Sequence, residues 1–211
     1  MEKLDYKKKF KELYQPKQTP SMIDVPEMKF IMIDGSGDPN DKDGEYQAAV
    51  KTLYALSYAI KMMQKSGNAP QDYFEYVVPP LEGLWWLANQ AEFDYSSKSK
   101  FYWTSMIRQP EFVTNEAFNS ACEITAKKKP QLDLSKARLS AFREGLCVQC
   151  MHIGSFDSEP ETLGRMKAFM AENGLQSDLS DTRRHHEIYL SDPRKVDIEK
   201  MKTVLRHPVK R

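Results

Sequence analysis

The sequence lacks long apolar runs and an excess of either charge. No apolar segment approaches the ~20 residues that a bilayer span needs. The stretch Met1–Lys7 has no apolar core, so we expect no signal peptide. The 31 basic and 30 acidic side chains leave a net charge of +1, whereas binding to a phosphate backbone needs a clear cationic excess. We therefore predict a cytoplasmic protein without a membrane or nucleic-acid partner, and interpret the run Lys127–Lys129 as a solvated helix end.

Motifs of nucleotide and serine-hydrolase chemistry are absent as well. The chain contains no G-x-x-x-x-G-K-[ST], no G-x-G-x-x-G and no G-x-S-x-G. We expect no cofactor.

Cysteine and histidine are scarce, with three and four residues. Cys147 and Cys150 form one C-x-x-C inside an expected strand, where the two side chains point to opposite faces, and no second pair could complete a zinc site. We interpret them as reduced core cysteines. His185 and His186 also face opposite ways, and no H-E-x-x-H or carboxylate cluster stands at ligand spacing near them. We predict no metal site.

The chain that remains is ordinary for a folded protein, with 211 residues, 40% apolar and 29% charged. Three landmarks recur in the same order: Gly35–Asp38 and Gly154–Asp157, Phe74–Val78 and His186–Leu190, and Met106–Pro110 and Val204–Pro208. Each first landmark is followed by an amphipathic helical pattern. Three matches in register predict a duplication, with Glu75 and Glu187 at equivalent positions.

Helical spacing of apolar residues predicts helices through Tyr46–Ile60, Thr114–Lys128 and Leu163–Met170, the last starting with a capping box at Ser158–Glu161. Short β-branched and aromatic runs predict strands at about 28–34, 73–78, 101–108, 144–153 and 184–190. We predict an α+β fold, with helices on one face of a curved antiparallel sheet and a ligand groove on the other.

The domain organisation follows from the same pattern. Residues 1–21 are expected to be a loosely packed N-terminal arm. A single domain, 22–211, then consists of two strand-helix-strand-strand repeats near 22–112 and 140–209, joined by a helix near 114–128. Because the two repeats close their own sheet, we expect a monomer.

Glu187 is the candidate centre of the site. Alternation along its strand puts Ile188 and Leu190 on the core face, which turns His185, Glu187 and Tyr189 into the cleft. A glutamate in such a strand is also compatible with a solvated outer face. Aromatic residues favour the functional interpretation, because a carboxylate among rings becomes a stronger base and also attracts planar cations. The expected cleft residues around it are Trp85, Trp86, Tyr102, Trp103, His152 and Phe156.

Four segments give the chain a resemblance to the GyrI-like family of small-molecule-binding domains. They are E-G-L-W-W at 82–86, M-I-R-Q-P at 106–110, E-G-x-C-x-Q-x-x-H-x-G at 144–154 and H-E-I-Y-L-S-D-P-R at 186–194. The resemblance implies two pseudo-symmetric units with a ligand groove between them. It also places at Glu187 the glutamate that binds cationic drugs in the effector domains of multidrug-sensing regulators. The residues ahead of the first expected strand are too few for a helix-turn-helix domain.

Some stand-alone members of the family resemble hydrolases that open the cyclopropane ring of duocarmycin-type DNA-alkylating compounds. This implies self-protection, with Glu187 as general base and Tyr189 orienting water or donating to an oxyanion. The family's usual G-P-Y-D loop is Gly154–Asp157 here, so Phe156 lacks the tyrosine hydroxyl. Two alternatives stay open: a sequestering protein without turnover, and a gyrase-binding module, which the balanced charge disfavours.

Overall fold

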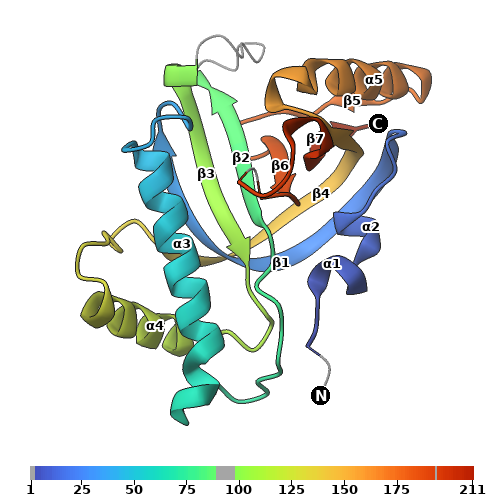
Figure 1. The fold of residues 1–211 in the computed structure, drawn as a ribbon. Coiled ribbons are helices and arrows are strands. Elements are labelled where there is room, and N and C mark those ends of the chain that lie inside the picture. Colours follow the sequence, from blue (N-terminus) through green and yellow to red (C-terminus); the bar gives the residue numbers. More distant parts are fainter. Residues whose placement is uncertain (1–2, 89–97, 193) are drawn as a thin grey trace.

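The computed structural model describes residues 3–88, 98–192 and 194–211, which form a mixed α+β fold (Figure 1). Its helices are α1 (Tyr6–Lys9), α2 (Lys11–Tyr14), α3 (Glu45–Met62), α4 (Asn115–Lys128) and α5 (Glu159–Glu172). Its strands are β1 (Ser21–Ser36), β2 (Leu81–Leu87), β3 (Phe101–Arg108), β4 (Arg138–Ile153), β5 (Gln176–Ser177), β6 (His185–Tyr189) and β7 (Lys202–Lys210). None of the described helices is long and apolar enough to span a membrane.

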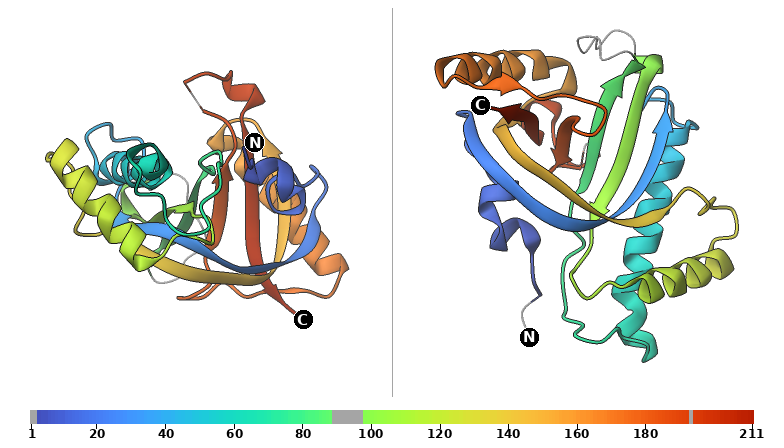
Figure 2. Two further views of the ribbon diagram at one scale, coloured as in Figure 1. Left: turned by 90° about the horizontal axis from the view of Figure 1, so that it is seen from below. Right: turned by 180° about the vertical axis from the view of Figure 1, so that it is seen from behind.

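The strands form one curved antiparallel sheet in the order β4-β1-β3-β2-β6-β7, which closes on itself because β4 also pairs with β7. The two-residue β5 adds to β7 outside this ring. The long, bent strands β1 and β4 cross the whole molecule and bring the two halves together, as both views in Figure 2 show. In the middle of the ring β2 pairs with β6, so Gly83 lies opposite Glu187 and Trp85 opposite His185.

The sheet has two distinct faces. On the helix face, Tyr46 of α3 packs on Trp85 and Trp103. Farther along the same face, α5 buries Met166 and Met170 against Leu205, the residue paired with Glu187. The opposite, inner face carries the alternate residues of each strand. Glu187 therefore lies on the face that α3 and α5 cover, and not on a helix-free face as predicted.

The N-terminal segment packs tightly, which corrects the expectation of a loose arm. Tyr6, Leu13 and Tyr14 are buried. Tyr14 donates a hydrogen bond to Glu82 (3.3 Å), and Arg206 donates to the carbonyl of Leu13. These apolar side chains and polar contacts fix the segment against the inner face.

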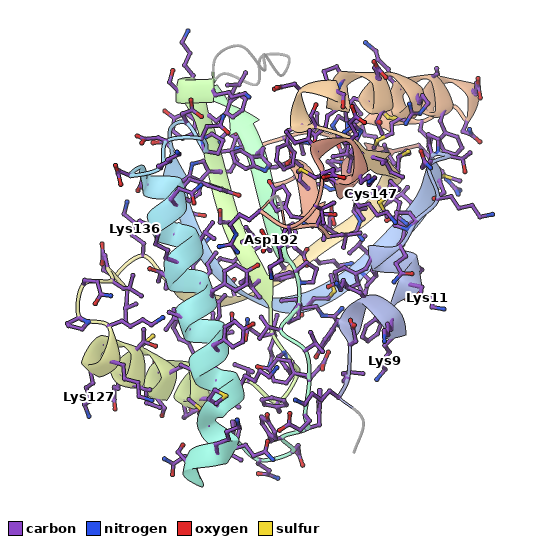
Figure 3. All side chains as sticks on the ribbon, in the orientation of Figure 1. Lys9, Lys11, Lys127, Lys136, Cys147 and Asp192 are labelled. Carbon is purple, nitrogen blue, oxygen red and sulfur yellow. The ribbon has the colours of Figure 1, made fainter. Side chains whose placement is uncertain are left out.

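The predicted strand 101–108 and the helix expected near 114–128 are confirmed. Lys127 projects into solvent at the end of α4, as the run 127–129 predicted (Figure 3). The predicted strand at 73–78 is wrong, because this segment is a loop that touches Leu4 through one isolated bridge at Tyr76. Aromatic content alone favoured a strand there, but these rings fill a cluster around Phe112 instead.

The sheet registers agree with two of the three landmark matches. Phe30 pairs with Arg108 and Gln149 with Arg206, and Gly35 and Gly154 lie equally far beyond Phe30 and Gln149. Ile107 and Leu205 each stand just before these matched arginines. Leu81 pairs with Ile107 and Glu187 pairs with Leu205, so Leu81, and not Glu75, is equivalent to Glu187. The proposed equivalence of Glu75 was therefore wrong. The duplication itself stays a prediction, to be tested by superposing the two units.

Candidate functional site

Glu187 lies on β6 near the seam between the two halves of the sheet and is 7% exposed. Both of its oxygens carry hydrogen bonds. Tyr189 donates its hydroxyl to Oε2 (2.7 Å), and Nε2 of His185 lies 3.1 Å from Oε1. The three side chains share one face because strand neighbours alternate, as predicted. Burial, followed by the nearby charge of Glu187, raises the pKa of Tyr189, so the phenol keeps its proton to donate.

Glu159 is the second carboxyl of the site. It begins α5 and is 1% exposed, and neither of its oxygens has a hydrogen-bond donor within the described residues. Burial and the adjacent negative charge of Glu187 raise the pKa of Glu159 well above its ordinary value. Two facing carboxylates can only accept, so a hydrogen bond forms between them when one holds a proton. Burial and the neighbouring Glu187 charge therefore favour the protonated form of Glu159.

The cluster also has the spacing of a metal site. One potential ligand atom from each of Glu159, His185 and Glu187 lies within 4.8 Å of the others. The sequence did not reveal this, because Glu159 reaches the site only through the packing of α5. In this structure His185 contacts Glu187, and both oxygens of Glu187 are already bonded. The arrangement in this structure is therefore a buried pair of carboxyl groups in which Glu187 carries the hydrogen bonds among the described residues. The absence of a metal stays a prediction.

Aromatic rings surround the carboxyl pair. Trp85 donates its indole N–H to the Tyr189 hydroxyl (2.8 Å), and its ring packs on Tyr46 at 5.3 Å between centroids. Trp103 is fully buried behind Tyr46. Phe156 meets the Tyr189 ring edge-on at 5.8 Å and is 36% exposed, so this pair forms the part of the aromatic wall that reaches the surface.

Three of the expected cleft residues lie elsewhere. Trp86 and Tyr102 stack on each other on the inner face, and the Arg184 guanidinium lies over Trp86. They face inward because each is adjacent in sequence to a tryptophan of the helix face, Trp85 or Trp103. His152 is on the helix face but its ring nitrogens contact Thr162 (2.9 Å) and the carbonyl of Ser155 (2.9 Å). It holds the start of α5 in place and does not contact Glu187 in the described hydrogen bonds.

A second buried cluster lies on the inner face, directly behind the site. His186 is 3.0 Å from Glu82 and 3.0 Å from Glu144, and Arg206 is 3.2 Å from Glu144. Burial alone would lower the pKa of His186, but the two carboxylates raise it to about 9. Burial opposes ionisation of Glu144 in the same way, and the charges of His186 and Arg206 overcome it and lower the pKa to about 2. This cluster is charged and ties four strands together.

Sequence reasoning missed Glu159 and Tyr46 as site residues. The capping-box pattern implies a solvated Glu159, but Ser158 donates to Ser155 instead of capping α5, and the helix begins at Glu159. The helical pattern assigns Tyr46 to the buried stripe of its helix and gives it no role in the site. Tyr46 and Glu159 each lie in the first turn of a helix that follows a Gly-containing loop. This shared position is the sequence signal that could have identified them as site residues.

The comparisons with known proteins agree with this fold. The family model of the GyrI-like small molecule binding domain matches residues 18–210. A structure described as a hydrolase from Listeria innocua is 49% identical with a TM-score of 0.89, covering 99% of this chain and 100% of its own. A structure described as an uncharacterized conserved protein from Listeria innocua is 50% identical with a TM-score of 0.93 and the same coverage.

More distant structures share the fold alone. The C-terminal domain of EcmrR is 13% identical with a TM-score of 0.55, covering 92% of this chain and 98% of that domain. No curated protein matches the chain. The family match spans nearly the whole chain, and this protein belongs to the family of GyrI-like small molecule binding domains.

Proposed function

We propose that this protein binds flat, aromatic, electrophilic small molecules at Glu187 and hydrolyses activated cyclopropane rings of the duocarmycin type. The observation that supports this proposal best is the asymmetric carboxyl pair. Glu187 has two hydrogen-bond donors and is suited to be the carboxylate, whereas Glu159 has none among the described residues and its raised pKa favours the protonated form. Two carboxyl groups in different environments are a common arrangement for acid-base chemistry.

In the proposed reaction Glu187 acts as general base. Its carboxylate takes a proton from water while the water oxygen bonds to the cyclopropane carbon. The ring C–C bond breaks, and its electron pair moves into the conjugated system of the substrate, whose carbonyl oxygen takes a proton from solvent. Glu187 returns its proton to solvent, so the net change is the addition of one water. Trp85, Tyr46 and Phe156 would hold the flat substrate against the pair.

The charge of the site favours neutral substrates. With one proton on Glu159, the Glu187 charge is already partnered by Tyr189 and His185, and little negative charge is left for a cation. A fully ionised pair would instead favour a planar cation. The protein would then be the binding protein without turnover of the second hypothesis. The hydrolase names of relatives at 49% identity favour the first hypothesis.

A direct test is mass spectrometry of a duocarmycin-type cyclopropane compound after incubation with the protein. We expect a gain of one water per ligand. In the Glu187→Gln protein, affinity should stay within a few-fold while turnover falls by ~10²–10⁴, the usual effect of removing a general base. Glu75→Gln, in the loop before β2, is the matched control and should change neither quantity.

Other outcomes would contradict the proposal. If no water is gained, and Glu187→Gln weakens cationic ligands while neutral ones bind as before, the protein is a cation-binding member. If Glu187→Gln has full turnover and unchanged affinity, Glu187 is not part of the site.

A further inference from the structure

A directional chain of hydrogen bonds leads from Trp85 to Glu187. The indole N–H of Trp85 lies 2.8 Å from the Tyr189 oxygen, and that oxygen lies 2.7 Å from Oε2 of Glu187. An indole nitrogen can only donate, and an ionised carboxylate can only accept. The Tyr189 oxygen must therefore accept from Trp85, and its single proton must point to Glu187.

We propose that Trp85 is a positioning residue that commits the Tyr189 proton to Glu187 and so keeps Glu187, rather than Glu159, in the carboxylate form. This inference rests on the proposed function for its catalytic consequence. It also changes the expected role of Tyr189, whose only proton is no longer available for an oxyanion on the substrate. Tyr189 then acts through Glu187, and Trp85 acts through Tyr189.

Gly83 provides the room for this chain. It is the cross-strand partner of Glu187. A Cβ at this position would lie 2.6 Å from Nε1 of Trp85 and 3.1 Å from the Tyr189 oxygen. Contacts this short force one of the two groups to move, so a glycine here is a steric requirement of the Trp85–Tyr189 bond. The segment Glu82–Trp86 thus contributes both the donor and the space it needs.

Other polar groups also surround the carboxyl pair, and Tyr46 of α3 shares a side-chain hydrogen bond with Tyr189. On β6 and β7, His185 bonds to the second oxygen of Glu187, and His207 packs against the His185 ring at 4.9 Å. Asp157 and Lys98 lie near Glu159 and pair with each other at 3.1 Å. Among these hydrogen bonds, only the Tyr189 hydroxyl is 2.7 Å from Oε2 of Glu187.

The first test is the pH profile of hydrolysis of a duocarmycin-type cyclopropane compound by the Trp85→Phe protein. This substitution keeps a ring and removes the donor. We expect kcat/KM to fall by about 2- to 10-fold, the effect of one ordinary hydrogen bond. The acidic limb of the profile should also move to higher pH by roughly half a unit to one unit, because the carboxylate form loses support.

Two variants accompany it. Gly83→Ala should shift the acidic limb in the same direction by displacing the donor. Trp86→Phe changes the neighbouring tryptophan on the inner face and should leave the profile of the wild type. If Trp85→Phe lowers the rate uniformly without moving the limb, the indole is only a wall of the site and the proposal is wrong.

A second measurement needs neither turnover nor a folded variant. In the ¹H–¹⁵N NMR spectrum of the wild-type protein, the indole proton of Trp85 should lie downfield of an indole proton without a hydrogen bond, because Trp85 donates to the Tyr189 oxygen at 2.8 Å. A Trp85 indole proton at the position of an unbonded indole would overturn the inference even if hydrolysis is observed. A downfield Trp85 proton without any hydrolysis would support the hydrogen-bond chain and reject the proposed reaction.

Discussion

His186 and Glu187 are neighbours on β6, yet their side chains enter opposite environments. Glu187 meets a second carboxyl on the helix face, and His186 meets two carboxylates on the inner face. One strand thus holds the candidate chemistry on one side and a structural ion cluster on the other. A substitution at either residue has to be interpreted with this difference in mind.

His186 should make stability fall as the pH rises above neutral. Its pKa is about 9 in the folded protein against an ordinary 6.5. The extra stability is fully present below about pH 6.5 and is lost as the pH rises through 9, because the unfolded state releases this proton first. We expect the free energy of unfolding to decrease by on the order of a few kcal/mol over this window, measured by urea titration.

The control for this prediction is His186→Gln. It should be strongly destabilised at neutral pH, by about 3–5 kcal/mol, because it leaves buried carboxylates unpaired. Its stability should change less between pH 6.5 and 9 than that of the wild type, because the His186 contribution is gone. His207, whose pKa burial and the neighbouring His185 lower to about 3, stays neutral throughout this window and cannot produce the effect. An unchanged pH dependence in His186→Gln would assign it to another group.

At the scale of elements, the Trp103 ring of β3 lies directly against Gly35 of the neighbouring strand β1. A Cβ on Gly35 would overlap the indole ring of the fully buried Trp103. Gly35→Ala should therefore destabilise the protein by about 1–3 kcal/mol through overpacking. Gly164, in the middle of α5, has open space where alanine would add its Cβ, so Gly164→Ala should stabilise by about 0.5–1 kcal/mol. Thermal unfolding of both proteins measures this contrast, and equal signs would contradict it.

The N-terminal segment should contribute to stability through α2. Tyr14 donates to the buried Oε1 of Glu82, which in turn faces His186. Tyr14→Phe keeps the ring and removes the donor, so we expect a loss of about 1–3 kcal/mol, the effect of leaving a buried acceptor unsatisfied. Lys9→Ala on the exposed side of α1 (Figure 3) is the control and should change stability by less than about 0.5 kcal/mol. Equal effects of the two changes would mean that the segment is held by packing alone.

For the whole molecule we predict a monomer. The six long strands close into a ring, so the described part of that ring offers no unpaired edge for a second copy. Only the two-residue β5 ends the sheet outside it. Light scattering should give the mass of one chain at micromolar concentration, and a stable dimer would show that another surface drives association.

Local sequence patterns were enough to predict the elements with strong periodicity and the alternation of side chains on β6. The patterns at 101–108 and 115–128 are long and uniform, so they were predicted closely. The alternation of strand side chains correctly grouped His185, Glu187 and Tyr189, and separated His185 from His186. A mixed α+β fold with an antiparallel sheet followed from the same local rules.

The partners that these side chains meet depend instead on long-range packing. Closure of the ring by β4 and β7 and the placement of α5 bring Glu159 to Glu187 across a gap of many residues. The inner cluster of Glu82, His186, Glu144 and Arg206 arises in the same way, from four strands that are distant in sequence. Alternation fixes a side chain's face relative to its neighbours, but it does not say which face a helix covers. That is decided by the packing of the whole chain, because the helices α3 and α5 pack on the face where their apolar stripes are buried.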